Sequence, residues 1–191
     1  TWGAGQGTGV QLVSGVGTSF NVQYTTPKIA GITVALAHAP NQGQVDTNDV
    51  SYGGVDTGTT GKAYDATVSL NPTLGTDVLS GLNMFVGASY TEVYKSHASG
   101  DQNDDRYEGV AGITLDLGPI SIGGARSGIL TGKTVGSTDV DYYRNNMYGI
   151  AFNINDDLSV SYGKHESEQN FVNPGVSEAV TMDVSSWQIA Y

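Results

Sequence analysis

An acidic stretch, DQNDDR at 101–106, has residue types and spacing that could bind a metal ion. Asp101, Asn103 and Asp105 have the alternating spacing of the first ligands in a calcium-binding loop. Such a loop also needs Gly at its sixth position and Glu at its twelfth, where this chain has Arg106 and Gly112. A solvated acidic loop is therefore the favoured interpretation, and a weak calcium site is the alternative. No other metal site and no cofactor is expected.

Two glycine-containing stretches resemble nucleotide-binding motifs without meeting their requirements. SGILTGKTVG at 127–136 has Ser127 where a phosphate-binding loop needs its first Gly, and no helical pattern follows it. GAGQGTG at 3–9 lacks the preceding strand and following helix of a dinucleotide-binding turn. The three histidines are far apart, and no nucleophile lies in a pattern with a base. The sequence therefore predicts that the chain is not an enzyme.

The composition excludes several classes of partner and structure. The chain has 191 residues, a net charge of −11, 27 Gly and no Cys. Its acidity argues against a nucleic-acid partner, which requires a basic surface. The absence of Cys excludes disulfides and thiolate metal sites. No apolar run reaches the ~18 residues of a membrane helix, whereas the strands of a membrane barrel need only about 9–11 residues.

Strict alternation of apolar and polar residues recurs along the chain, and no segment of helical length has a 3.6-residue period. The alternation predicts about nine strands, at 19–24, 31–38, 62–71, 81–94, 106–118, 120–130, 142–154, 158–163 and 185–191. Within 120–130 we interpret Gly123–Gly124 as a slip of phase, produced by a β-bulge.

The connections alternate between short turns and polar loops. TPKIA, LGP and NINDD are short, and 71–81 is somewhat longer. The segments 40–61, 96–105, 132–140 and 168–179 are longer and polar. This rhythm predicts an all-β, antiparallel, up-and-down sheet with a short-turn rim and a long-loop rim. Transmembrane β-barrels are built in this way.

The apolar sides of these segments have aromatic residues near their ends and small or aliphatic residues between. Two aromatic girdles around a lipid band would produce this distribution. The predicted lipid-facing girdle residues are Tyr24, Tyr64, Tyr90, Tyr107, Tyr148, Phe152, Trp187 and Tyr191. The opposite sides are polar, as a water-filled interior requires. The predicted pore-lining residues are Asp65, Arg106, Glu108, Asp116 and, beyond the predicted bulge, Arg126.

The stretch FNVQYTTPKIAGITVALAHAPN at 20–41 resembles the Gram-negative general porins. Tyr24, Pro27 and Gly31 match that family's aromatic-ended strand, Tyr-x-x-Pro turn and following Gly. The basic residue that often begins the strand before this turn is absent, with Gln23 and Thr18 in that neighbourhood, and no acidic constriction cluster is visible in 1–17. The constriction residues are therefore not assigned.

The resemblance implies a transmembrane barrel of about 16 strands in the outer membrane of a Gram-negative bacterium. It further implies a homotrimer in contact with outer-membrane lipid and lipopolysaccharide, through which small hydrophilic solutes and ions diffuse passively. Residues 1–191 would form one incomplete barrel domain. In it, 1–17 would be the tail of an inward-folded loop, and 18–191 the strands with short periplasmic turns and long outer loops.

Two further interpretations remain open. Nine strands is an odd number, whereas bacterial single-chain barrels have an even number, so we expect the chain to be a fragment. The alternative is that Tyr191 is the natural terminal aromatic. A soluble or surface-exposed all-β binding module, such as an adhesin or a lectin-like sheet, is the alternative function. It would be extracted without detergent, unlike a porin.

Overall fold

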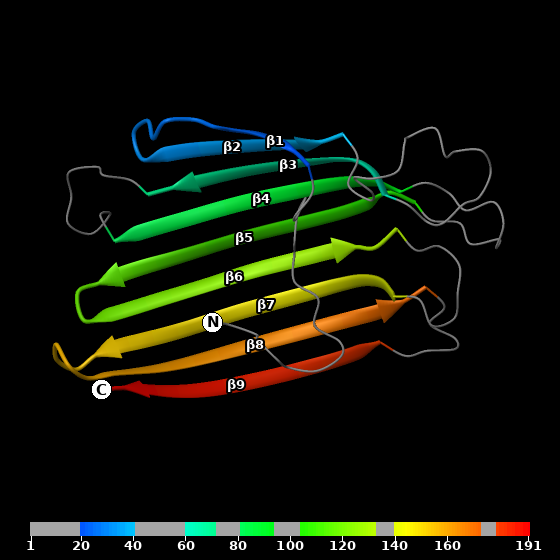
Figure 1. Ribbon diagram of the computed structural model, residues 1–191. Coiled ribbons are helices and arrows are strands. Elements are labelled where there is room, and N and C mark those ends of the chain that lie inside the picture. Colours follow the sequence, from blue (N-terminus) through cyan, green and yellow to red (C-terminus); the bar gives the residue numbers. More distant parts are fainter. Residues whose placement is uncertain (1–19, 41–59, 72–80, 94–103, 133–139, 173–178) are drawn as a thin grey trace, which may run out of the picture.

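The computed structural model describes residues 20–40, 60–71, 81–93, 104–132, 140–172 and 179–191. These residues form one nine-stranded antiparallel sheet in which each strand pairs with the next along the chain (Figure 1). The strands are β1 (Val22–Thr25), β2 (Ile32–Ala39), β3 (Thr60–Leu70), β4 (Leu82–Val93), β5 (Arg106–Leu117), β6 (Ile120–Leu130), β7 (Val140–Asn153), β8 (Ser159–Phe171) and β9 (Val180–Ala190). Within these ranges no helix is long and apolar enough to cross a membrane.

The predicted all-β, up-and-down arrangement of nine strands is confirmed. The sheet is open, with β1 and β9 at its two edges. The predicted closed barrel is therefore not seen in the part of the chain that the structure describes. The short connections lie at one end of the strands in Figure 1.

The β1–β2 hairpin forms where Pro27 and Gly31 predicted it. The Thr26 N–H donates to the Val34 carbonyl over 2.9 Å, and the Val34 N–H donates to Thr26 Oγ1 over 3.0 Å. Ala30 and Gly31 have φ angles of 50° and 84°, in the left-handed region that Gly adopts most readily. The two positive φ angles reverse the chain direction before β2 begins.

The predicted bulge at Gly123–Gly124 is wrong. The β5–β6 ladder continues without a shift through both glycines, with Gly124 opposite Ile113 and Arg126 opposite Ala111. Two glycines in succession interrupt the visible hydrophobic alternation because they have no side chains, and they leave the pleat unchanged. Arg126 therefore lies on the same side of the sheet as Ile122, opposite to the side predicted for it.

Strands β8 and β9 are longer than predicted. β8 extends to Phe171, well beyond the predicted end at 163, and β9 begins at Val180 where 185 was predicted. Both sides of β8 are polar over Lys164–Gln169, so this stretch has no two-residue period. Its strand structure comes from pairing with β7 and β9.

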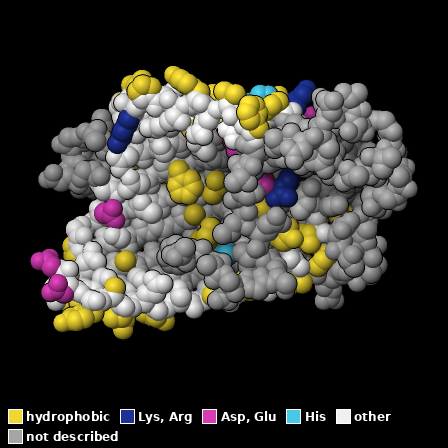
Figure 2. Space-filling model, viewed as in Figure 1, with side chains coloured by type: hydrophobic (Ala, Val, Ile, Leu, Met, Phe, Trp, Pro, Cys, Tyr) yellow, Lys and Arg dark blue, Asp and Glu magenta, His cyan; other side chains and the backbone are white. Residues whose placement is uncertain are grey.

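Alternation along each strand and the cross-strand register divide the side chains between two faces. The apolar face carries Leu36, Val68, Val86, Ile113 and Ile150, and the polar face carries Asp65, Ser89, Glu108, Asn145 and Ser167. Figure 2 looks at a hollowed surface, with hydrophobic side chains projecting at its upper and lower margins.

Burial is inverted relative to a protein folded around an apolar core. Every buried strand residue with a side chain in the described part of the chain lies on the polar face: Ala39, Ala63, Ser89, Thr91, Glu108, Ser127, Ile129, Asn145 and Ser167. On the apolar face, Val86 is 52% exposed and Ile150 is 49% exposed. The described sheet thus leaves its large apolar side chains uncovered and encloses polar ones.

Candidate functional site

Three of the predicted wall residues lie near one another on the polar face, from the middle of β3 to the loop end of β5. Asp65 lies opposite Ser89, and Ser89 lies opposite Glu108, so the two carboxylates flank one serine in a single cross-strand row. Arg106 follows on the same face and donates from Nε to Glu108 Oε1 over 2.7 Å. Its Nη2 lies 2.6 Å from the same oxygen.

The side chain of Glu108 is 4% exposed, whereas that of Arg106 is 26% exposed. An isolated charge is costly to enclose, so the guanidinium compensates the carboxylate directly. The pair places a fixed positive charge beside a fixed negative charge on the wall of the polar face. The two opposite charges create a local dipole on this wall, and together they add nothing to its net charge.

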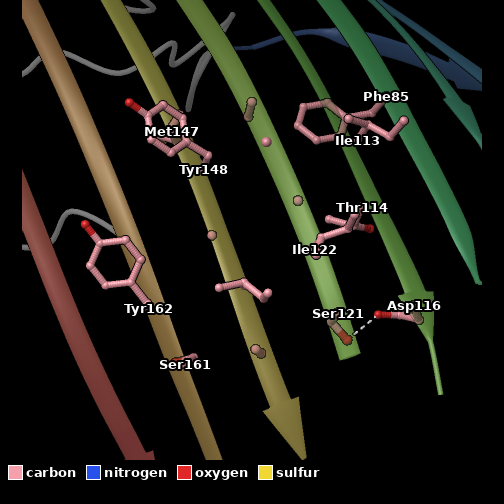
Figure 3. A pocket seen from close by; sticks show the side chains of 16 residues that line it. Phe85, Ile113, Thr114, Asp116, Ser121, Ile122, Met147, Tyr148, Ser161 and Tyr162 are labelled. Atoms are coloured by element: carbon pink, nitrogen blue, oxygen red, sulfur yellow. Dashed lines mark hydrogen bonds between the residues drawn. The ribbon is translucent and has the colours of Figure 1, made fainter. Parts of the chain in front are cut away.

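Asp116 lies apart from this group, near the short-turn end of β5. Its Oδ1 accepts a hydrogen bond from Ser121 Oγ over 2.6 Å, the dashed line in Figure 3. Asp116 is exposed on the polar face. The structure therefore brings Asp65, Arg106 and Glu108 into one neighbourhood and leaves Asp116 at the far end of the strand. Arg126 lies on the apolar face.

A buried polar row that the sequence did not predict crosses β6, β7 and β8. Asn145 is fully buried between its register partners Ser127 and Ser167. Its Nδ2 donates to Ser127 Oγ over 3.3 Å, and its Oδ1 lies 3.2 Å from His165 Nε2. The alternation of Tyr148 and Phe152 places Asn145 on this face, but its burial depends on Ser127 and Ser167 across the sheet.

A second unpredicted feature of the polar face is a hollow of about 430 Å³ against β4 to β8. Figure 3 shows its lining, in which Phe85 on β4, Thr114 on β5 and Met147 on β7 are polar-face side chains. Gly123 lies opposite Gly149, so two adjacent strands have no side chains there. A Cβ on Gly112 would overlap the Phe85 ring, because the aromatic ring covers that glycine.

The predicted girdle residues within strands all lie on the apolar face. Some of them, together with His38 and Tyr162, form two groups of neighbouring aromatic rings. Near the loop ends, ring centroids are 4.5 Å apart for His38 and Tyr64, 6.2 Å for Tyr64 and Tyr90, and 5.3 Å for Tyr90 and Tyr107. Toward the short turns, Tyr162 and Trp187 are 4.8 Å apart. Tyr24, Tyr148 and Phe152 share this face, and Tyr191 follows β9 fully exposed.

The calcium hypothesis stays a prediction. Asp105 accepts a hydrogen bond from the Tyr90 hydroxyl over 2.7 Å, while Asp101 and Asn103 lie outside the described residues. Among the described residues there is no group of three or more His, Cys, Asp or Glu that could hold a metal ion. Ser127–Leu130 of the nucleotide-like stretch belongs to β6, and the predicted inward-folded segment 1–17 also lies outside the described residues.

No protein-family model matches the chain, and no curated protein matches it.

Proposed function

We propose that the chain forms part of the wall of an outer-membrane porin, through which small hydrophilic solutes and ions diffuse passively. The observation that carries this proposal is the inverted burial of the sheet. Soluble monomers rarely expose contiguous apolar patches above a few hundred Å². A face with large exposed apolar side chains on β2 to β6 and along the short-turn ends of β7 and β9 is stable when lipid replaces water against it.

Strand length and aromatic placement support the same proposal. Strands β3 to β9 have 11 to 14 residues, and a tilted membrane strand needs about 9–11. The aromatic groups lie toward both ends of the apolar face, as interfacial girdles do. Tyr64, Tyr90 and Tyr107 would meet the outer interface, and Tyr162 with Trp187 would lie nearer the short turns.

Closure of the sheet is part of the proposal. β1 and β9 each leave one edge without a strand partner in the described sheet. Backbone groups left unpaired in lipid are costly, so a membrane sheet must close on itself. Further strands would complete a barrel of about 16, the size typical of water-filled porins. The resemblance of 20–41 to general porins also supports a homotrimer in a Gram-negative outer membrane.

The polar face would then line the water-filled lumen. Asp65, Glu108 and Asp116 carry negative charge there, and Arg106 carries positive charge next to Glu108. Wall charges of one sign favour counter-ions in a pore. We therefore expect a weak preference for cations.

The test is conductance in a planar bilayer, with the complete natural chain extracted from membranes. We expect stepwise conductance and, across a salt gradient, a reversal potential that indicates cation selectivity. Glu108→Gln should shift the reversal potential in the direction of lower cation selectivity. Asp183→Asn is the matched control, because it removes the same charge from the apolar face. Absence of conductance, or release of the wild-type chain without detergent, would favour the binding-module alternative instead.

A further inference from the structure

The hollow of about 430 Å³ on the polar face has a floor made of glycines. Gly123 lies opposite Gly149, and Gly149 lies opposite Gly163, so this row has no side chains over three adjacent strands. Neighbouring rows on the same face are two residues apart along each strand, which is about 6.7 Å. The side chains on the two sides of the glycine row therefore face each other across a trough about 13 Å wide, measured between backbones.

The row on the loop side of the glycines is rich in carbon. It runs from Phe85 through Gly112 and Ala125 to Met147. Phe85 is 46% exposed, although it projects from the polar face. Its ring reaches across to β5 and covers Gly112. The aromatic ring thus lies along the wall, beside the glycine floor.

The row on the short-turn side of the glycines is polar. It contains Asp116, Ser121, Ala151 and Ser161, each opposite the next. Figure 3 shows Phe85 and Met147 toward one end of the hollow and this polar row toward the other. Within the described part of the chain, Asp116 accepts no side-chain hydrogen bond except that from Ser121. The second carboxylate oxygen of Asp116 and the hydroxyl of Ser161 can therefore bind hydroxyl groups of a ligand.

We propose that this hollow binds the ring of a pyranose sugar. A pyranose has a face of C–H groups and an edge of hydroxyl groups, so it matches a trough with one apolar and one polar side. The C–H face packs against the glycine floor and Phe85, because the face of an aromatic ring is negative and attracts weakly positive hydrogens. The hydroxyl edge points to Asp116 and Ser161. The proposal rests on the proposed function for its setting, the wall of a water-filled lumen.

The two sides of the trough favour a neutral sugar over other small solutes. An acyclic polyol has the hydroxyl groups but no fixed C–H face for Phe85. An aromatic solute has the flat face but no series of hydroxyl groups for the polar row. An anionic solute would meet the carboxylate of Asp116, and like charges repel. The volume of the hollow lies in the range of small-molecule sites, about 300–1,000 Å³.

The test is saturation-transfer NMR of methyl α-glucopyranoside with the complete natural chain in detergent micelles. We expect transfer to the ring C–H protons of the sugar. Phe85→Leu keeps Gly112 covered but removes the aromatic face, and should weaken binding about two- to tenfold. Asp116→Asn replaces a charged acceptor by a neutral one and should weaken binding about fivefold. Tyr143→Leu is the matched control, because it removes an aromatic ring from the polar face outside this hollow.

Several results would overturn the sugar site. They are absence of saturation transfer, equal affinity for the acyclic polyol sorbitol, and tighter binding of benzyl alcohol than of the sugar. Wild-type affinity in either Phe85→Leu or Asp116→Asn would overturn it as well. Conductance separates the two proposals. A conducting protein whose variants bind the sugar with wild-type affinity refutes only the sugar site, whereas sugar binding by a protein that does not conduct refutes only the porin.

Discussion

Val86 offers the sharpest test of whether the apolar face contacts lipid. It is the middle member of the outward series on β4, which consists of Leu82, Met84, Val86, Ala88 and Tyr90. It lies opposite Val68 on β3 and Ala111 on β5, at the centre of the apolar face. A charge at this position would therefore lie near the middle of a lipid band about 25 Å tall.

The expected effect of Val86→Arg follows from these positions. An arginine at the midplane of a lipid-facing barrel surface lowers the free energy of unfolding by about 2–4 kcal/mol. Loss of valine adds about 1 kcal/mol, because burial of a whole valine contributes about 1.5–3 kcal/mol and this side chain is 52% exposed. The sum is about 3–5 kcal/mol in lipid. The same substitution on a water-exposed surface changes stability by about 0.5 kcal/mol or less.

The assay is denaturant unfolding of the complete natural chain in phospholipid vesicles, followed by tryptophan fluorescence. Thr67→Arg is the matched control, because Thr67 is exposed on the polar face and lies opposite Gly87 on β4. We expect Thr67→Arg to change the free energy of unfolding by about 1 kcal/mol or less. Equally small losses for both variants would refute the lipid-facing assignment, and with it the proposed porin.

Two further predictions concern positions inside the sheet. Asn145→Ala should lower the free energy of unfolding by about 1–3 kcal/mol, because it leaves Ser127 and His165 without their buried partner. Asn146→Ala, on the opposite face, is the control and should change the free energy of unfolding by about 0.5 kcal/mol. Equal losses for the two variants would contradict the burial argument. Gly81→Ala should cost about 1–3 kcal/mol, because its Cβ would overlap the Asp116 backbone carbonyl. Gly109→Ala, with open space at its Cβ, should leave the midpoint temperature of thermal unfolding unchanged or raise it slightly. If Gly109→Ala lowers stability as much as Gly81→Ala does, the steric explanation is refuted.

Strand positions could be predicted from sequence wherever one face of a strand is apolar. In β3 and β5, residues such as Val68 and Ile113 alternate with Thr67 and Thr114, and the strands form where this alternation occurs. The turn at Pro27 and Gly31 was predictable as well, because Pro cannot donate to a ladder and Gly accepts positive φ. These signals are local, so a single sequence contains them.

The remaining features depend on contacts between strands. The second half of β8 is polar on both sides, and the pairing of Glu166 with Asp183 and Glu168 with Thr181 holds it as a strand. The burial of Asn145 likewise depends on its neighbours across the sheet, since Asn145 and Asn146 are chemically identical in sequence. Local alternation places Asn146 on the side of Tyr148 and Ile150 and Asn145 on the other side, but how deeply Asn145 is buried depends on the strands beside it.

The corrected position of Arg126 changes the expected electrostatics of the proposed pore. With Arg126 on the polar face, the predicted wall residues would have carried two basic and three acidic groups. Its place on the apolar face leaves Asp65, Glu108 and Asp116 with Arg106 alone. Arg106 contacts Glu108, so these two opposite charges offset each other within the set. The same correction therefore strengthens the expectation of cation preference in the lumen.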